Sequence, residues 1–214
     1  EVRSLRCSDG LNIRYRVAGN PKSKPIVFLY GLMCSHYYFK YQWESLNQNY
    51  FLICPDYRGH HASEKPQALS TLTFPRIAKD IYEILLAEQV SGPATFIGHS
   101  MGVNLGLEFY KQYPDKVAAL CLLAGAASFP LHNLDDRKNF EKTNWWLRIL
   151  DSLAPTLGDK IWALQGEIPL FRDFGVFIAK YVGGFNPDLS NIEDIKTCIS
   201  SYSHFKPSEF FQLI

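Results

Sequence analysis

The stretch "ATFIGHSMGVNLGLEFY", Ala94 to Tyr110, sets a short apolar run before a turn of small residues and a helical pattern after it. Within it, "GHSMG" from Gly98 to Gly102 matches the pattern G-x-S-x-G. This pattern is typical of a nucleophile elbow, in which a serine occupies a strained turn between a strand and a helix with its hydroxyl exposed. The glycines leave room for neighbouring backbone, and the start of the helix supplies N–H groups that favour negative charge. We therefore interpret Ser100 as a candidate nucleophile.

An ordinary turn with a helix-capping serine is the alternative interpretation of the same residues. At average glycine and serine usage, a G-x-S-x-G match is expected by chance in about one chain in twenty of this length. The strand-like run before Ser100 and the helical pattern after it make a chance match rarer still. The sequence context therefore favours the elbow.

Short apolar runs alternate with longer amphipathic runs through the first part of the chain. Residues 11–19 alternate at a period of two, which predicts an antiparallel hairpin, and the later runs are continuously apolar, as in strands buried on both faces. The predicted strands are 26–30, 51–55, 94–98 and 117–124, and the predicted helices are 36–47, 74–89 (with Ile77, Ile81, Ile84 and Leu85 on one face) and 101–112. This alternation predicts the α/β class, with a mostly parallel, doubly wound sheet.

Helical patterns replace the strand-like runs from Phe129 onward. We expect helices at 134–153, 168–182 and 190–204, the last opened by a capping box of Ser190 and Glu193. The predicted domains are therefore the N-terminal part of an α/β core over 1–128 and a helical cap over 129–214. Aromatic side chains are frequent in this cap and favour an apolar pocket and a hydrophobic substrate. They are Phe129, Phe140, Trp145, Trp146, Trp162, Phe171, Phe174, Phe177, Tyr181 and Phe185.

Composition and charge exclude several classes of protein. The 214 residues are 47% hydrophobic and 20% charged, as in one globular domain with or without an insertion. A net charge of +1 with interspersed signs offers no extended basic surface, so nucleic acid is not an expected partner. The longest apolar runs fall short of the roughly 18 to 20 residues that span a bilayer, so no membrane span is expected. No signal-peptide pattern is present, which favours a cytoplasmic location.

The cysteines and the other metal-ligating residues do not form a recognisable ligand set. The five cysteines, Cys7, Cys34, Cys54, Cys121 and Cys198, are an odd number without a C-x-x-C pair. We therefore expect reduced and mostly buried thiols rather than disulfides or a zinc site. No motif implies a metal ion or any other cofactor.

Across essentially its whole length, the sequence resembles the α/β-hydrolase superfamily, and within it the cap-bearing esterases and lipases. The resemblance rests on "SDGLNIRYRVAG", "PIVFLYGL", "CPDYRGHHAS", "GHSMG" and "GFNPDLSNIEDI", in this order and spacing. It implies that Ser100 is the catalytic nucleophile and that Gly98 and Gly102 are the elbow glycines. The backbone N–H groups of Leu32 and Met101 would form the oxyanion hole. An acyl-enzyme on Ser100 would then be resolved by water.

Two positions depart from the pattern of this family. Most relatives carry His-Gly where this chain has Tyr30 and Gly31, and most carry glycine where His61 stands. The histidine that precedes this first glycine commonly braces the oxyanion loop, so Tyr30 makes the shape of that loop an open question. A serine rather than an aspartate at the elbow argues against dehalogenase or epoxide-hydrolase chemistry.

The resemblance also implies an acid and a histidine on loops after later strands, in the chain order Ser, Asp or Glu, His. The sequence ends at "EFFQLI" before any such strand, so we expect a truncated chain that lacks the acid and the histidine of the triad, with roughly 60 to 80 residues missing from a typical domain. Of the histidines present, His36 and His204 could approach the site, and His99 is expected to pack away from the nucleophile. We also expect a charge-assisted bond between Asp56 and Arg58.

Three functions stay open at this point. The first is a serine hydrolase that acts on an ester or related acyl bond of a small, hydrophobic substrate. The second is a non-catalytic ligand-binding or interaction protein on the same fold. The third is another acyl-group enzyme, such as an acyltransferase, a peptidase or a carbon–carbon bond hydrolase. The intact elbow favours the first and the third over the second, with a small acyl substrate as the partner, and the sequence does not indicate an oligomeric state.

Overall fold

The computed structural model describes residues 1–32, 34–125 and 191–202 of the chain. The chain divides into two units, of which the first is formed essentially by residues 1–127 and the second contains a helix near the C-terminus. The predicted domain boundary at 128 and the predicted helices at 134–153 and 168–182 lie outside the described residues.

A six-stranded sheet forms the core of the first unit, in the order β1-β2-β4-β3-β5-β6. Its strands are β1 (Val2–Arg6), β2 (Asn12–Ala18), β3 (Pro25–Leu29), β4 (Phe51–Pro55), β5 (Ala94–His99) and β6 (Val117–Leu123). β1 and β2 form the predicted antiparallel hairpin, and β2 pairs antiparallel with β4. β4, β3, β5 and β6 run parallel. The prediction of a mostly parallel α/β sheet is confirmed.

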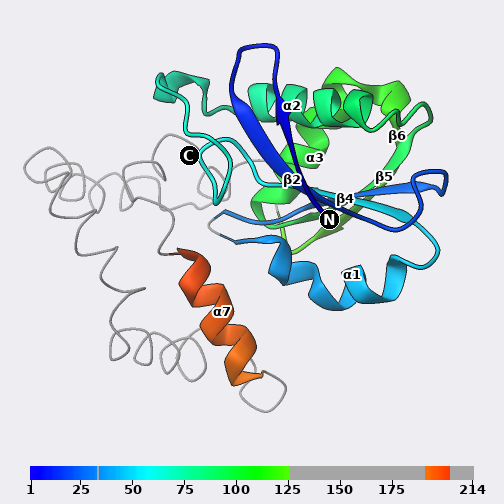
Figure 1. The fold of residues 1–214 in the computed structure, drawn as a ribbon, viewed down its shortest axis with the longest axis vertical. Helices are drawn as coiled ribbons and strands as arrows, with labels where there is room; N and C mark the ends of the chain where they lie inside the picture. Colours follow the sequence, from blue (N-terminus) through cyan, green and yellow to red (C-terminus); the bar gives the residue numbers. More distant parts are fainter. Residues whose placement is uncertain (33, 126–190, 203–214) are drawn as a thin grey trace, which may run out of the picture. The chain divides into compact units, whose positions relative to one another are not determined.

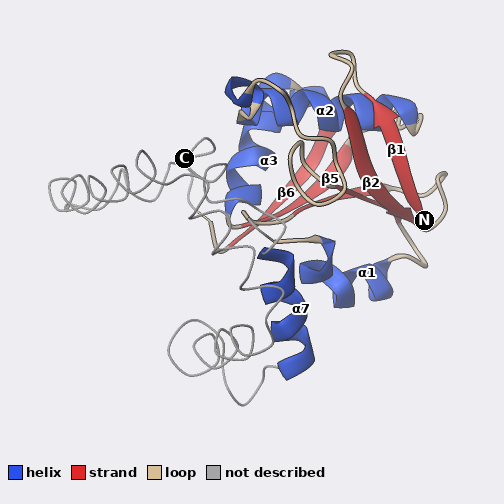
Figure 2. Ribbon diagram, turned by 60° about the vertical axis from the view of Figure 1, so that its left-hand side comes forward, coloured by secondary structure: helices blue, strands red, loops and turns tan. Residues whose placement is uncertain are grey.

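Helices cover both faces of this sheet (Figure 1, Figure 2). On one face, the short 3-10 helix η1 (His36–Phe39) leads into α1 (Lys40–Leu46). On the other face, α2 (Phe74–Ala87) and α3 (Met101–Gln112) lie side by side. Two further 3-10 turns are η2 (Leu69–Thr71) and η3 (Pro114–Lys116). The result is the layered arrangement of helix, sheet and helix that a doubly wound fold requires.

Helix α2 shows how the apolar period of the sequence becomes packing. Its first turn is capped by Thr73, whose hydroxyl accepts a hydrogen bond from the Arg76 N–H at 3.4 Å. The side chains of the predicted apolar face are all buried: Ile77, Ile81, Ile84 and Leu85. Burial of one such side chain stabilises the fold by roughly 1.5–3 kcal/mol. This face therefore holds α2 against the sheet.

Burial distinguishes the central strands from the edge of the sheet. β4 is buried along its whole length, as the sequence predicts for a strand covered on both faces. β6 is mostly exposed, with Leu122 at 41% and Leu123 at 43% exposure. The burial on both faces that the apolar pattern of residues 117–124 suggests is therefore not found in the part of the chain that the structure describes, where β6 forms the unpaired edge that is expected in the absence of the later strands. The reason is its position, because β6 is an edge strand there and β5 is the strand with which it pairs.

In the second unit, the described helix is α7 (Ile192–Tyr202), which falls within the predicted helix at 190–204. Its start is capped by Asn191, whose side-chain oxygen accepts a hydrogen bond from the Glu193 N–H at 2.9 Å. The predicted capping box assigned this N–H to Ser190, which lies outside the described residues. Asparagine is as good a helix cap as serine. The cap is therefore Asn191, one residue later than predicted.

Gly98 and Gly102 allow α3 to lie directly on β5 and β3. A Cβ atom at Gly98 would lie 2.5 Å from the Gly102 carbonyl oxygen, and one at Gly102 would lie 2.7 Å from the Leu29 carbonyl carbon. Both distances are far below the contact distance of about 3.5 Å between carbon atoms. One turn later in α3, a Cβ atom at Gly106 would meet side-chain carbons at 3.6 to 3.8 Å, which is ordinary contact.

Replacing Gly102 by alanine should lower the free energy of unfolding by more than about 2 kcal/mol, because the methyl group meets backbone that cannot move aside. Gly106→Ala is the matched control on the same helix and should be neutral or stabilising by up to about 1 kcal/mol, since alanine favours the helix. Urea unfolding of both variants measures the difference. Equal unfolding free energies would contradict the packing at Gly102.

Candidate active site

Ser100 lies exposed in the turn between β5 and α3. Its backbone has φ 54° and ψ −119°, in the positive-φ region that a residue with a side chain rarely adopts. Two hydrogen bonds hold the turn: the Ser100 N–H donates to the Leu123 carbonyl at 3.0 Å, and the Val103 N–H donates to the Ser100 carbonyl at 2.9 Å. The strained strand-to-helix turn expected from the motif is therefore present at this serine.

The location of Ser100 in the sheet is a topological switch point. From β3 the chain passes through α1 to β4 on one side, and from β5 it passes through α3 to β6 on the other side. In open α/β sheets, ligands bind at the carboxyl ends of the strands where the strand order reverses. The carboxyl end of β5 carries Ser100, and the carboxyl end of the neighbouring β3 carries residues 30–32.

Gly31 brings the loop after β3 against Ser100. A Cβ atom at Gly31 would lie 3.0 Å from the Ser100 Cβ and 3.4 Å from its hydroxyl oxygen. The segment that carries Leu32 therefore lies beside the candidate nucleophile. The elbow motif predicts clearance at Gly98 and Gly102 but not this role of Gly31, for which the signal in the sequence is a glycine just after an apolar strand.

The histidines near Ser100 pack elsewhere. The ring of His99 stacks on Tyr38, with centroids 5.0 Å apart and planes at 26°. Burial lowers the pKa of His99. Across residues 1–32, 34–125 and 191–202, no histidine forms a hydrogen bond with the Ser100 hydroxyl; the histidines in these ranges are His36, His60, His61 and His99. The described residues therefore do not supply Ser100 with a base.

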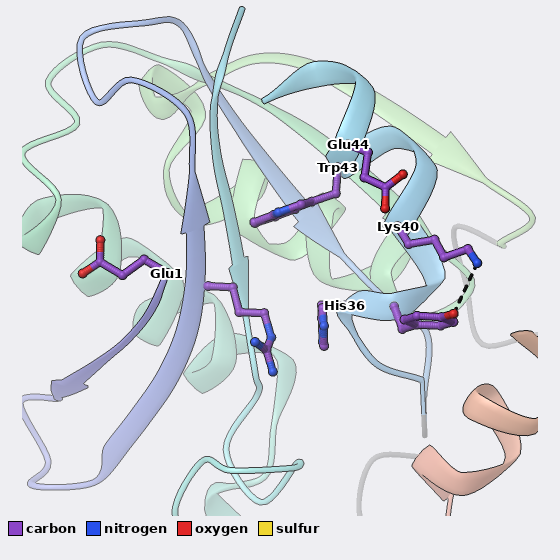
Figure 3. Close-up of a pocket in the computed structure, with 7 residues that line it drawn as sticks. Glu1, His36, Lys40, Trp43 and Glu44 are labelled. Atoms are coloured by element: carbon purple, nitrogen blue, oxygen red, sulfur yellow. Dashed lines mark hydrogen bonds between the residues drawn. The ribbon is translucent and has the colours of Figure 1, made fainter. Parts of the chain in front are cut away.

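A pocket of about 360 Å³ lies beside η1 and α1 (Figure 3). The Lys40 ammonium on its wall donates a hydrogen bond to the Tyr37 hydroxyl at 3.2 Å. Burial, with the positive charge of Arg16 nearby, lowers the pKa of His36 to about 4. His36 thus lines this pocket and is not joined to Ser100. The lining residues are Glu1, Arg16, His36, Tyr37, Lys40, Trp43 and Glu44.

Tyr30 and Tyr57 form a buried cluster behind the loop after β3. The Tyr30 hydroxyl donates to Asp56 at 3.5 Å and accepts from the Tyr57 N–H at 3.3 Å. The Tyr57 hydroxyl donates to the Tyr30 carbonyl at 2.9 Å. Burial raises the pKa of both tyrosines and of Asp56. Both phenols therefore stay protonated: the Tyr57 hydroxyl donates to the loop after β3, and the Tyr30 hydroxyl donates to Asp56 in the loop after β4.

Arg58 is fully buried and pairs with Asp80 rather than with Asp56. Its Nε and Nη2 atoms donate to the two Asp80 carboxylate oxygens at 2.7 Å each, and Nη2 also reaches Asp9 at 3.1 Å. The predicted bond between Asp56 and Arg58 is therefore wrong. The planar guanidinium matches a carboxylate that it can engage through two parallel bonds, and Asp80 on α2 offers that geometry. This pair ties the loop after β4 to α2.

The cysteines and acidic residues show no sign of a metal centre within the described ranges. No group of three or more His, Cys, Asp or Glu side chains there could hold a metal ion. None of the five cysteines forms a disulfide; Cys7, Cys34 and Cys54 are buried, whereas Cys121 is exposed on the edge strand. No helix in the same ranges has the length and apolar character needed to cross a membrane.

Comparisons with known proteins give a consistent relationship. Residues 24–175 match a protein family described as alpha/beta hydrolase fold. Epoxide hydrolase 3 of Mus musculus is 25% identical over 118 residues, which cover 55% of this chain and 32% of that protein. The uncharacterized hydrolase YugF of Bacillus subtilis is 32% identical over 116 residues, which cover 53% of this chain and 42% of that protein. The chain therefore spans less than half the length of these relatives.

A solved structure shows the same fold. The crystal structure of a variant of an epoxide hydrolase from Bacillus megaterium, complexed with its product, is similar with a TM-score of 0.69 and 18% sequence identity. The similarity covers 98% of this chain and 70% of that chain. At this identity the likeness concerns the fold.

His60 generates a prediction about pH. Burial lowers its pKa to about 4, and its Nδ1 lies 3.2 Å from the Arg58 carbonyl oxygen. A histidine in the unfolded chain titrates near pH 6.5, so between about pH 6.5 and about pH 4 the unfolded chain binds more protons and stability falls as the pH falls. From pH 7 to pH 5, the free energy of unfolding of the wild type should therefore fall by about 2 kcal/mol more than that of His60→Gln, measured by urea unfolding at both pH values. An unchanged loss in the variant would contradict the neutral burial of His60.

Proposed function

The chain belongs to the α/β-hydrolase fold family, and on this premise we propose that it carries the nucleophile of a serine hydrolase acting on an ester or related acyl bond. The observation that supports this most is the state of Ser100, exposed, strained and at the first turn of α3. A serine that served only as a helix cap would accept a hydrogen bond from an N–H of that turn. The side chain of Ser100 makes no capping bond.

The proposed oxyanion donors are the backbone N–H groups of Met101 and Leu32. Met101 is the first residue of α3, where N–H groups have no partner inside the helix. Leu32 follows Gly31, which packs against Ser100. Donors of this kind act on the charge that develops in the transition state, and the loss of one costs about 10²- to 10³-fold in kcat.

The reaction would proceed through an acyl-enzyme. The Ser100 hydroxyl oxygen attacks the carbonyl carbon while its proton passes to a histidine, which we place outside the described residues. The carbonyl oxygen becomes negatively charged and accepts hydrogen bonds from the two N–H donors. The bond to the leaving alcohol breaks as that alcohol takes the proton from the histidine. Water then attacks the Ser100 ester and releases the acid.

Epoxide opening is the competing proposal, because that is the activity in the names of two of the similar proteins. The residue type at position 100 disfavours it. A serine that attacks an epoxide carbon would form an ether, which water does not readily cleave, whereas attack on an acyl carbon forms an ester that water does cleave. An acyltransferase or a peptidase would use the same Ser100 and the same oxyanion donors with a different acceptor or leaving group.

A fluorophosphonate probe should label the natural full-length protein at Ser100, and Ser100→Ala should abolish the labelling. The probe forms the same kind of tetrahedral centre that the oxyanion donors stabilise. Ser91→Ala, at an exposed serine before β5, is the control and should label like the wild type. Mass spectrometry detects the label. Labelling that persists in Ser100→Ala would mean that another nucleophile carries the activity.

The substrate class can be tested with two small molecules. The natural full-length protein should hydrolyse p-nitrophenyl butyrate, with loss of turnover in Ser100→Ala, and should not open styrene oxide. Release of p-nitrophenol and chromatography of the diol measure the two reactions. Diol formation that depends on Ser100 would overturn the proposed acyl chemistry.

A further inference from the structure

His61 is held in an unfavourable backbone conformation. It is a half-buried residue with φ 48°, in the left-handed region that a residue with a side chain rarely adopts. Such strain persists only where the surrounding structure enforces it, and it is concentrated at functional sites. The contacts of this side chain therefore indicate what the conformation serves.

The imidazole of His61 contacts the loop after β3. Its Nε2 lies 2.8 Å from the Cys34 carbonyl oxygen. A carbonyl oxygen can only accept, so Nε2 carries the hydrogen and donates it. Cys34 is buried, and its N–H donates to the Gly31 carbonyl at 3.1 Å. The bond from His61 therefore fixes the far end of a tight turn whose near end packs on Ser100.

The near end of the same loop is fixed from the same side. The Tyr57 hydroxyl donates to the Tyr30 carbonyl at 2.9 Å, and Tyr30 lies two residues before Leu32. His61 donates to the Cys34 carbonyl, and Cys34 lies two residues after Leu32. Both donors belong to the loop after β4. That loop is anchored to α2, because Arg58 within it donates two hydrogen bonds to Asp80.

The side chain of Tyr30 bonds the loop after β4. Its hydroxyl is engaged with Asp56 and with the Tyr57 N–H. Its ring meets the His61 ring edge-on, with centroids 5.9 Å apart and planes at 75°. The side chains at the two positions that depart from the family pattern are thus in contact with each other. Of these two side chains, that of His61 bonds the loop after β3.

We propose that His61 is a positioning residue of the oxyanion loop, which holds the Cys34 carbonyl so that the Leu32 N–H faces the site of negative charge. This inference rests on the proposed function, in which Leu32 is an oxyanion donor. His61 does not touch the reacting atoms and acts through the backbone between Gly31 and Cys34.

The test compares His61→Gly with His61→Gln in the natural full-length protein. Glycine accepts the left-handed backbone but removes the donor, so kcat for p-nitrophenyl butyrate should fall about tenfold or more, a part of the loss expected for a missing oxyanion donor, with a smaller change in KM. The urea midpoint of unfolding should stay close to that of the wild type, because relief of strain offsets the lost bond. Glutamine places an N–H near the position of Nε2, so kcat should stay within about threefold of the wild type.

A second readout does not depend on turnover. Hydrogen exchange of the amides in residues 31–35 should become faster in His61→Gly than in the wild type and should stay slow in His61→Gln. Three outcomes would each overturn this inference while leaving the proposed function in place. They are Ser100-dependent turnover with an unchanged kcat in His61→Gly, an equal loss of kcat in both variants, and unchanged amide exchange in His61→Gly. Absence of Ser100-dependent turnover in the wild type would overturn the proposed function and this inference together.

Discussion

The approach of α3 to the backbone of β3 at Gly102 is the constraint on which the rest of the site depends. With no side chain at Gly98 or Gly102, the helix begins within contact of the Leu29 carbonyl group. The chain must then turn from β5 into α3 in a single residue, and Ser100 takes the positive φ that this requires. The same closeness brings Gly31, at the end of β3, against the serine. A strained serine and its neighbouring loop therefore follow from one packing contact.

Periodicity and motif could predict the elements of the core and the position of Ser100, because both depend on residues close together in the sequence. Partners distant in the sequence could not be predicted in this way. Arg58 was assigned to Asp56, its near neighbour, but it bonds Asp80, which is 22 residues away on another element. Likewise, Tyr30 and His61 were identified as departures from the family pattern, but their contact and the bond of His61 to Cys34, 27 residues away, required the fold.

A continuous apolar run does not by itself distinguish a central strand from an edge strand. β4 and β6 are both continuously apolar in sequence, yet β4 has β2 and β3 beside it, whereas β6 pairs with β5 at the edge of the described sheet. An apolar composition allows a strand to be buried, and the order of the strands in the sheet decides whether neighbouring strands cover it. Tyr57 shows the same limit, since its role in fixing the loop after β3 depends on its bond to the Tyr30 carbonyl, 27 residues away in the sequence.

The strained backbone of Ser100 has a consequence for how this protein would respond to selection. Glycine is the residue that adopts a positive φ without cost, so the variant Ser100→Gly would relax the turn that serine holds under strain. Under the proposed function, the same change removes the reacting oxygen. Selection for heat resistance alone would therefore accept glycine at this position, and only selection for turnover would retain serine, as in other proteins where activity and stability oppose each other.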